Sequence, residues 1–502
     1  MYARNVAEEP GRLKDDNVSQ FHFEGSLTTR DGKRHIPHRF VAPADAGQID
    51  IHLRIAPEGS QGMKHLITLT VFDPAGFRGA GHRGGSEHRV RIAAAETTPG
   101  YLPGPLPAGE WIVQLDTHRI MPGEPVHYWL DVEVQTRAAA PDADPSTSRG
   151  LQRPETDQGL RSPELVRAVS RTTPRGPGWY RGDLHTHTHH SDAQGRSVAD
   201  LIELARGAGL DFIFLTDHNT TAGLAEADAA GEDGLLVAAG IELTTFWGHA
   251  LCLGRRDWVD WRIRPGTGEI AAIAAETYAA GQVFIIAHPQ SNGDPGCTGC
   301  AWRFGDMMPG AARLVEIWNG PWAGDSNNEA SLALWYDWLN QGYRLAATAG
   351  SDTHSQRNYA NRPGFNVLYA AALTEAALLD ALLAGHLYVS AGPQISFQAV
   401  AHVPGTCEVP GTSTAERAGG ETWISGDTAT GPATFTLAWA DCPAAARVRV
   451  IVDGKLLAER PAAPGDGSHT WRMMPADAHW VLAEIRGDDG QMLAVTNPIF
   501  FQ

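Results

Sequence analysis

Two histidines spaced by one residue, His185 and His187, open the densest group of metal-binding side chains in the sequence. They lie in the run RGDLHTHTHHSD, residues 181–192, where an apolar strand is expected to end in a loop. Because alternate residues of an extended strand point to the same side, both imidazoles can bind one metal ion. The loop can then carry Asp192 toward a neighbouring ion. The spacing therefore predicts one edge of a metal centre.

Further polar clusters directly follow the apolar runs at residues 212–216, 283–287 and 345–351. The carboxyl ends of strands are where a βα barrel places its ligands. One structural zinc needs only four ligands, so a larger set leaves room for two or three ions with open positions. Imidazole and carboxylate without thiolate favour Zn, Mn or Fe over copper or an iron–sulfur cluster. The predicted metal ligands are His185, His187, Asp192, His218, Glu242, His249, His288, Asp352 and His354.

The elements that position these residues divide the 502-residue chain into several domains. Residues 1–137 contain strands of period two, such as 49–55, and are predicted to form an antiparallel β-sandwich. Residues 138–177 begin with small, polar and proline residues and are predicted to be a linker. Residues 398–502 return to strands and are predicted to form a second β domain.

Residues 178–397 alternate short apolar strands with Ala- and Leu-rich helices. The helices are expected at residues 198–209, 269–281 and 375–385. Strand followed by helix, repeated, predicts a largely parallel sheet or barrel. The whole chain is therefore expected to be a multidomain α/β plus β protein with the metal centre in its middle region.

Composition narrows the classes of partner. The formal net charge is −18, from 58 acidic and 40 basic residues, and it repels nucleic acid and anionic membranes. No run reaches the ~20 apolar residues of a membrane helix, and the first residues lack the apolar segment of a signal peptide. We therefore expect a soluble, cytoplasmic protein.

Five cysteines form a sparse and odd-numbered set, which is not typical of a disulfide framework. Cys297 and Cys300 make one C-x-x-C pair, whereas a structural zinc site would want a second such pair. We expect these two thiols to be inert or locally paired. The other cysteines are Cys252, Cys407 and Cys442.

Five ordered motifs of this chain resemble those of the PHP (polymerase and histidinol phosphatase) domain. They read HTHTHHSD, TDHN, GIELTT with GHALCLG, AHP and SDTH. The wider arrangement, with VEIWNG and a β tail ending in TNPIF, is similar to the CehA/McbA metallohydrolases, the branch that includes carbaryl hydrolase. The resemblance covers about residue 178 to the C-terminus and leaves the N-terminal sandwich outside it.

The resemblance implies a distorted seven-stranded βα barrel that holds up to three metal ions. It assigns the first ion to His185, His187, Glu242 and Asp352. Glu242 would bridge to a second ion, bound by His249 and His288. The third ion would be held by Asp192, His218 and His354, although many relatives carry His where Asp192 stands.

Such a trinuclear centre predicts hydrolysis of an anionic ester. Three divalent ions, the carboxylates and a bridging hydroxide would leave a charge of about +2. A metal pair lowers the pKa of bound water from 15.7 to roughly 7, so the metal-bound hydroxide would attack phosphorus in line. Relatives act on phosphate monoesters, phosphodiesters, nucleic acid ends and carbamate esters. We therefore predict a small-molecule phosphoester substrate and no nucleic-acid partner.

Several other residues are candidates for contacts with the substrate or with the ligands. His189 and His190 could bind the leaving group or belong to a solvated loop. Asn319 could contact substrate or occupy an ordinary turn, and Arg357 could clamp phosphate or form a surface ion pair. The remaining candidates are Glu316, which could face the site, Asp183 and Asp217, which could orient ligands, and Trp247 and Trp318, which could wall an aromatic pocket or pack in the core.

Two alternatives remain open. A carbamate or carboxylic ester hydrolase would use the same hydroxide on a carbonyl carbon. A protein of another class would use its β domains to bind a glycan or a partner protein, with Trp111, Tyr128 and Trp129 as an exposed platform and the barrel as scaffold. The period-two placement of Trp111 argues that it faces a core instead. A nuclease is disfavoured by the charge and by the lack of a basic stretch around the motifs.

Overall fold

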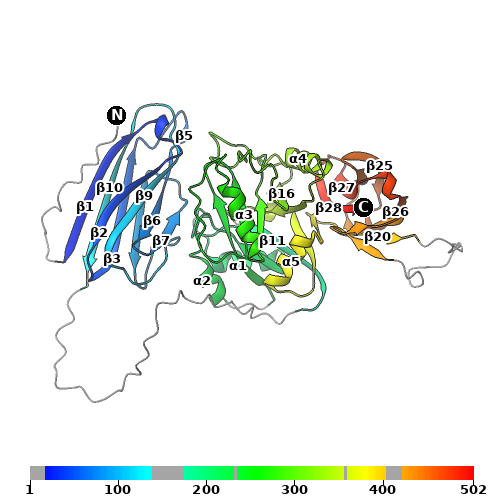
Figure 1. The fold of residues 1–502 in the computed structure, drawn as a ribbon, viewed down its shortest axis with the longest axis horizontal. Helices are drawn as coiled ribbons and strands as arrows, with labels where there is room; N and C mark the ends of the chain where they lie inside the picture. Colours follow the sequence, from blue (N-terminus) through cyan, green and yellow to red (C-terminus); the bar gives the residue numbers. More distant parts are fainter. Residues whose placement is uncertain (1–16, 138–174, 194, 231–233, 356–358, 403–420) are drawn as a thin grey trace, which may run out of the picture.

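The computed structural model describes residues 17–137, 175–193, 195–230, 234–355, 359–402 and 421–502. An N-terminal β region, a central region of strands and helices, and a C-terminal β region follow one another along the chain (Figure 1). Arg357, Cys407 and most of the predicted linker lie outside the described residues. Within those residues, no helix combines the length and apolarity needed to cross a membrane.

The N-terminal region is a sandwich of two four-stranded antiparallel sheets. Alternate residues of each strand point inward, so that Ile49, Leu53 and Trp111 lie in a shared core. Trp111 and Tyr128 are buried there, so these two face the core, whereas Trp129 is half-buried. One sheet has the order β1 (Val18–Leu27), β10 (Val126–Thr136), β3 (Ala46–Ala56), β8 (Glu87–Ala93), the other β2 (His35–Ala42), β9 (Gly109–Arg119), β6 (Leu66–Asp73), β7 (Gly76–Gly81), and a short hairpin joins β4 (Gly59–Ser60) to β5 (Met63–Lys64).

The central region is built on one mixed sheet. Pairs β11–β12, β12–β13, β15–β16 and β16–β17 are parallel, whereas β13–β14, β14–β15, β11–β18 and β18–β19 are antiparallel. The strands stand in the order β17 (Ala346–Gly350), β16 (Leu314–Asn319), β15 (Val283–Ile286), β14 (His249–Leu253), β13 (Leu236–Thr244), β12 (Phe212–Leu215), β11 (Gly178–Thr186), β18 (Phe365–Ala370), β19 (Leu387–Ser390).

This sheet is a curled half-barrel, and the regular alternation of strand and helix of the predicted (βα)7 barrel is not shown. The connection from β13 to β14 is too short for a crossover helix, so the two strands form an antiparallel hairpin. Helices are correspondingly few. The predicted helices appear as α1 (Val198–Gly207), α3 (Glu269–Ala279) and α5 (Glu375–Ala384), joined in the described residues by α2 (Leu224–Ala229), α4 (Asn328–Asn340) and the short turns η1 (Thr29–Asp31), η3 (Tyr359–Asn361) and η4 (Pro475–Asp477).

The curl brings the end of β17 back to β11. There the Asp352 backbone N–H donates to the carbonyl of His185 at 3.0 Å. A parallel bridge between Thr186 and Thr353 continues this contact. Ligand-bearing residues from opposite ends of the sheet are thereby brought together.

Two buried asparagines take the place of a neighbouring strand along the free edge of β17. Asn497 Oδ1 accepts from Ala347 N at 2.6 Å, and its Nδ2 donates to Ala347 O at 2.9 Å. Asn366 binds Ala349 in the same way. Its Oδ1 accepts from Ala349 N at 2.9 Å, and its Nδ2 donates to Ala349 O at 2.7 Å. A primary amide carries a donor and an acceptor side by side, as a strand residue does. The edge that a closed barrel would pair is therefore satisfied by side chains.

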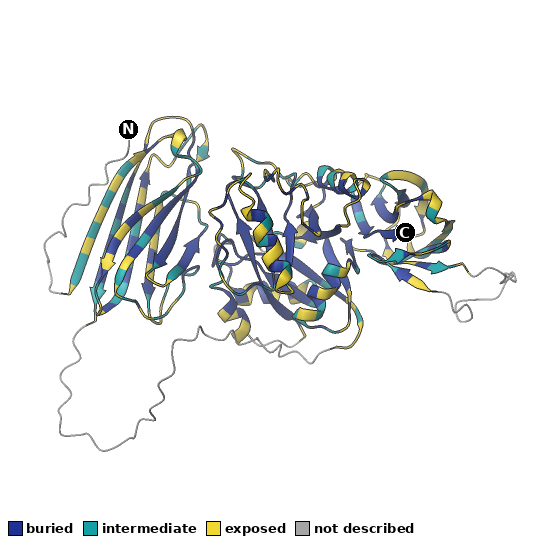
Figure 2. Cartoon of the chain, in the orientation of Figure 1, coloured by how far each residue is buried: buried dark blue, intermediate teal, exposed yellow. Residues whose placement is uncertain are grey.

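The C-terminal strands form a second layered unit that continues the central sheet, because β19 pairs with β28. A separate sheet packs on it across a shared apolar core, with buried faces turned inward (Figure 2). Strand β20 (Gln394–Ala401) spans the predicted domain boundary. The separate sheet has the order β21 (Thr422–Ile424), β20, β23 (Ala433–Cys442), β26 (Gly465–Met473), and the strands that extend the central sheet are β28 (Met492–Thr496), β27 (Trp480–Gly487), β24 (Ala446–Val452), β25 (Lys455–Ala462), β29 (Ile499–Phe501) and β22 (Thr428–Ala429).

Candidate metal centre

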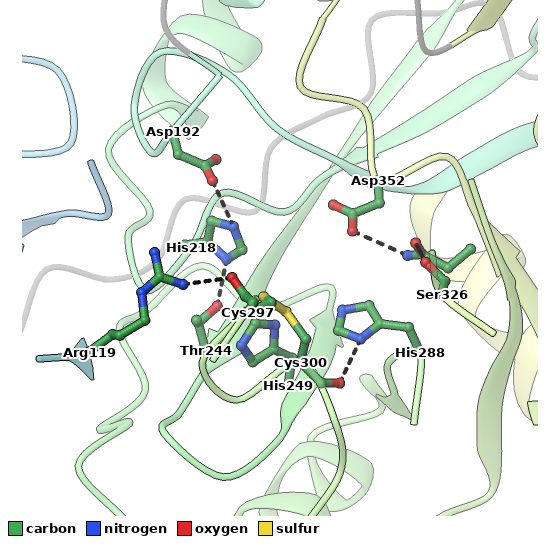
Figure 3. The surroundings of a disulfide bond; sticks show 12 residues. Arg119, Asp192, His218, Thr244, His249, His288, Cys297, Cys300, Ser326 and Asp352 are labelled. Atoms are coloured by element: carbon green, nitrogen blue, oxygen red, sulfur yellow. Dashed lines mark hydrogen bonds and ion pairs between the residues drawn. A yellow bond between two sulfur atoms is a disulfide. The ribbon is translucent and has the colours of Figure 1, made fainter. Parts of the chain in front are cut away.

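The nine side chains predicted from the strand ends lie together in one cluster. Of these, Figure 3 labels Asp192, His218, His249, His288 and Asp352. The nine side chains fall into four overlapping groups, and within each group the ligand atoms lie within 4.8 Å of one another. The groups are His187 with Asp192, His218 and His354; His185 with His288 and Asp352; His185 with His187 and Glu242; and Glu242 with His249 and His288.

Glu242 occupies the middle of the cluster. Its Oε2 lies 3.3 Å from His185 Nε2, 3.4 Å from His187 Nε2 and 2.7 Å from His218 Nδ1. Its Oε1 lies 3.0 Å from His249 Nδ1 and 3.4 Å from His288 Nε2. The two oxygens thus face different imidazoles, which is the arrangement of a carboxylate that bridges two ions.

A second carboxylate, Asp352, lies close to His185 and His187 and also to the partly exposed His354. Its Oδ1 lies 3.5 Å from His185 Nε2, 3.0 Å from His187 Nε2 and 3.6 Å from His354 Nδ1. The third carboxylate is Asp192. Its Oδ2 lies 3.4 Å from His218 Nε2, and its Oδ1 lies 3.1 Å from His354 Nε2. His187 therefore stands between two groups, whereas the resemblance assigned it to one.

The donor set fits divalent metal ions. His185 Nε2, His187 Nε2, Glu242 Oε2 and His249 Nε2 are buried and have no hydrogen-bond partner. A buried polar atom left without a partner costs about 1–3 kcal/mol. Three of these atoms face one another, since His185 Nε2 and His187 Nε2 lie 3.3 and 3.4 Å from Glu242 Oε2, and an ion bound between them would satisfy all three. Nitrogen and oxygen donors without sulfur suit Zn, Mn or Fe.

Two of the residues in the cluster have unusual backbone conformations. His288 has φ 27° and Asp352 has φ 48°. Non-glycine residues with positive φ are uncommon and carry a conformational cost. Both residues follow the ends of strands, where this backbone conformation turns the chain out of the sheet and places the side chain at the cluster.

Glu316 on β16 holds His185 and His288 in place through hydrogen bonds. It is fully buried, and its Oε1 accepts from His185 Nδ1 at 3.0 Å. Its Oε2 accepts from the backbone N–H of His288 at 3.0 Å and from Asn319 Nδ2 at 3.1 Å. A carboxylate at Nδ1 fixes the tautomer of His185 with Nε2 free to bind metal.

Replacing Glu316 by Gln should weaken metal binding by about 10–100-fold without removing a ligand. The amide keeps the volume of the side chain but has one acceptor oxygen in place of two, so either the His185 ring N–H or the His288 backbone N–H would face an NH2 group. Metal titration against a competing chelator, with Glu459→Gln on the surface as control, measures this loss. Unchanged affinity in the Glu316 variant would contradict the orienting role.

Other buried charges hold the loops that carry the ligands. Asp217 accepts from Thr188 N, Thr188 Oγ1 and Ser191 Oγ, each at 2.7 Å. Asp183 accepts from the backbone of His185 at 3.2 Å and of Ser351 at 3.0 Å. Both carboxylates thus bind the ligand-bearing segments, mainly through backbone atoms and hydroxyls. Arg196, which the sequence did not single out, donates to the carbonyls of His187 and Thr353 and ties the two loops together.

The remaining candidates lie in different surroundings. His190 Nε2 lies 2.9 Å and His189 Nε2 3.7 Å from Glu226, which makes a separate group beside the main cluster. Asn319 is buried and lies 3.3 Å from Asp352 Oδ2. Trp318 is fully buried in the core, whereas Trp247 is half-buried beneath Lys33. An aromatic pocket walled by both tryptophans is therefore not formed.

Cys297 and Cys300 form a disulfide beside His249 and His288 (Figure 3). The carbonyl of Cys300 lies 3.1 Å from His288 Nδ1 and fixes that ring with Nε2 turned to Glu242. The expectation of a local pairing is met. The buried thiols of Cys252 and Cys442 are free.

Charge coupling within the cluster shifts many pKa values. Burial opposes ionisation of Glu242, yet His218 and His185 hold its pKa well below the usual range. Burial likewise raises the pKa of Asp192, but His218 and His354 lower it further, so that it lies well below the usual range. Against the opposing effect of burial, neighbouring carboxylates raise the pKa of His185 well above its usual value and that of His354 to about 9. Protons on imidazoles thus supply the positive charge that metal ions would bring.

Metal affinity should therefore rise with pH between about pH 6 and 8. The raised pKa values of His185, His218 and His354 mean that metal must displace protons from these rings. Each displaced proton makes affinity about tenfold higher per pH unit until the pH passes the folded-state pKa. The carboxylates stay ionised across this pH range, so they do not change how metal affinity depends on pH. Competition titrations at three pH values measure the effect, and a flat profile would contradict it.

Comparisons with known proteins give partial likenesses. No family model matches the chain. A segment of 66 residues is 39% identical to a 5'-3' exoribonuclease of Haemophilus influenzae, and it spans 13% of this chain and only 24% of that protein. The match therefore leaves most of the exoribonuclease without a counterpart here.

Solved structures give fold-level likenesses of low score. A two-domain protein of Bacteroides vulgatus, described as containing a predicted PHP-like metal-dependent phosphoesterase, matches with TM-score 0.34 and 14% identity over 70% of this chain and 100% of its own. A Bifidobacterium adolescentis protein, provisionally described as a metal-dependent phosphoesterase, matches with TM-score 0.25 and 17% identity over 35% of this chain and 88% of its own. TM-scores below 0.5 are too low to assign an activity.

Proposed function

We propose that this protein is a PHP-type metal-dependent hydrolase of small phosphoesters, of the CehA/McbA-like branch. The observation that carries the proposal is the central position of Glu242 among imidazoles, two of which, His185 and His187, keep a buried Nε2 without a hydrogen bond beside its Oε2. Divalent ions bound there would lower the pKa of a water ligand to about 7 and provide hydroxide at neutral pH. No other buried nucleophile is needed in this proposal.

Each of the three ions would be held by its own set of residues. His185, His187, Glu242 and Asp352 would hold the first ion, and His249 and His288 would join Glu242 around the second. Asp192, His218 and His354, with His187 nearby, would hold the third. Glu316 and the Cys300 carbonyl fix the rings of His185 and His288 so that the donor nitrogens stay in place.

Charge favours an anionic substrate. Three divalent ions would outweigh the carboxylates of the cluster by about two charges once a hydroxide is counted. Glu316 adds one negative charge beside His185, and the buried guanidinium of Arg196 compensates for it. The open side of the cluster is formed by Asp192 and His354, whose side chains are 26% and 35% exposed. A small ester would approach from that side.

The test is a parallel assay of metal-loaded protein with bis(p-nitrophenyl) phosphate, p-nitrophenyl phosphate and 1-naphthyl N-methylcarbamate. Turnover of a phosphate ester that disappears with chelation and returns with added metal would support the proposal. Activity on the carbamate alone would replace it with the carbamate hydrolase. Activity that survives complete removal of metal would overturn the mechanism.

A further inference from the structure

The N-terminal sandwich is attached to the central domain around the metal centre. Lys33 Nζ donates to the Phe246 carbonyl at 3.0 Å and pairs with Asp294 at 2.7 Å. Arg119 donates to the carbonyls of Pro295 and Gly296, both at 2.6 Å. Figure 3 shows Arg119 beside the segment that carries the disulfide. These contacts fix the sandwich against the loops that follow β13 and β15.

A second set of contacts holds the loop that carries Asp192. Arg83 donates to the Ser191 carbonyl at 3.2 Å and to the His189 carbonyl at 2.8 Å. The backbone N–H of Gly100 donates to His190 Nδ1 at 3.0 Å, and Thr220 Oγ1 donates to the Gly100 carbonyl at 2.8 Å. The sandwich therefore reaches the open side of the cluster as well.

His82, directly after β7, is the sandwich residue that lies against the ligands. Its ring centroid is 4.6 Å from that of His218 and 4.7 Å from that of His118. Burial lowers the pKa of His82 to about 3. The charged groups that also act on this pKa are His218, Asp192, His249 and Glu242, and all four belong to the metal cluster. Among the described residues, the ring nitrogens of His82 have no hydrogen-bond partner, although the side chain is only partly exposed.

Other histidines of the sandwich show what an ordinary structural role looks like. His118 is buried and bonds Thr68 through Nε2 at 3.0 Å, and His38 bonds the hydroxyl of Tyr128 at 3.1 Å. His65 accepts from the backbone of Met121 at 3.0 Å. Each of these rings binds the sandwich itself. The His82 ring instead lies against His218 of the metal cluster in the other domain.

We propose that the sandwich is part of the active site and that His82 binds an oxygen of a small phosphate ester held at the group of His187, Asp192, His218 and His354. This inference rests on the proposed function and adds the residue that selects the substrate. An imidazole N–H is a good donor to a phosphoryl oxygen. A polymeric ester would have to displace the sandwich, so the composite site accepts small molecules.

The experiment compares His82→Ala and His82→Gln with His88→Gln, a matched change on β8 of the sandwich. Each full-length variant is loaded with metal, and its metal content and unfolding temperature are measured first. Inorganic phosphate binding is then followed by calorimetry, and kcat and KM are measured on bis(p-nitrophenyl) phosphate. These readouts separate binding of the substrate oxygen from binding of metal.

We expect His82→Ala to keep its metal and unfolding temperature while the Kd for phosphate and the KM rise about tenfold, the effect of losing one hydrogen bond. His82→Gln, which keeps a donor, should recover part of this loss, and His88→Gln should match the parent protein. Unchanged phosphate affinity in His82→Ala, or a loss of metal that accounts for the weakening, would overturn the inference. If the parent protein hydrolyses no ester while phosphate binding still depends on His82, the proposed function fails and the binding role stands.

Discussion

Replacing Glu242 by Gln is expected to lower kcat/KM by about 10³-fold or more and to remove at least one metal ion from the purified protein. Both carboxylate oxygens face imidazoles of the cluster, from 2.7 to 3.4 Å away. A neutral amide cannot bridge two cations with equal strength, and its N–H₂ group would face a ligand position. Metal content by mass spectrometry and steady-state kinetics measure the two effects.

Glu226→Gln is the matched control for this change. Glu226 lies against His189 and His190, next to the cluster but outside its four shared groups. The control should therefore keep its metal content and its activity within a few-fold. A Glu242 variant that retained full metal and parental activity would show that the cluster does not use this carboxylate as a bridge.

Replacing Asn366 by Leu is expected to destabilise the protein by about 2–6 kcal/mol, since each of two buried backbone groups loses its partner at about 1–3 kcal/mol. Asn366 is fully buried and binds both the N–H and the carbonyl of Ala349. Because β17 leads into Asp352, the variant should also lose metal affinity. Chemical denaturation followed by fluorescence measures the stability, and metal titration measures the second effect.

Asn361→Ala, on an exposed turn, is the control for this substitution. It should change stability by less than about 0.5 kcal/mol. Equal stability of Asn366→Leu and the parent protein would show that the edge of β17 is satisfied in another way. Loss of metal without loss of stability would point to a direct role of Asn366 in the centre.

The grouping of the candidate ligands could be predicted because it depends on local rules. His185 and His187 share a strand face, and His288 and Asp352 follow apolar strands whose ends meet at one side of the sheet. The sandwich could be predicted for a similar reason, since alternation along β3 and β10 determines which residues face its core. These features need only the neighbouring residues of the same segment.

The rest depends on contacts between distant segments. The predicted barrel is met only as a curled sheet, because the short β13–β14 connection reverses the chain and because side chains of Asn366 and Asn497 satisfy the edge of β17. Helix α4 was missed because its buried face is rich in tryptophan, at Trp335 and Trp338, so it did not resemble the Ala- and Leu-rich helices. His82 lies far from every motif in the sequence, and only the docking of two domains brings it to the metal cluster.

The asparagine contacts on β17 also set an order of events during synthesis. Asp352 leaves the ribosome well before Asn497, whose amide completes the strand that leads into Asp352. A nascent chain can therefore carry all nine ligands while the strand beneath one of them still has unpaired backbone groups. We therefore expect assembly of the centre to depend on Asn497 as well as on the candidate ligands, because Asn497 binds the strand that leads into Asp352.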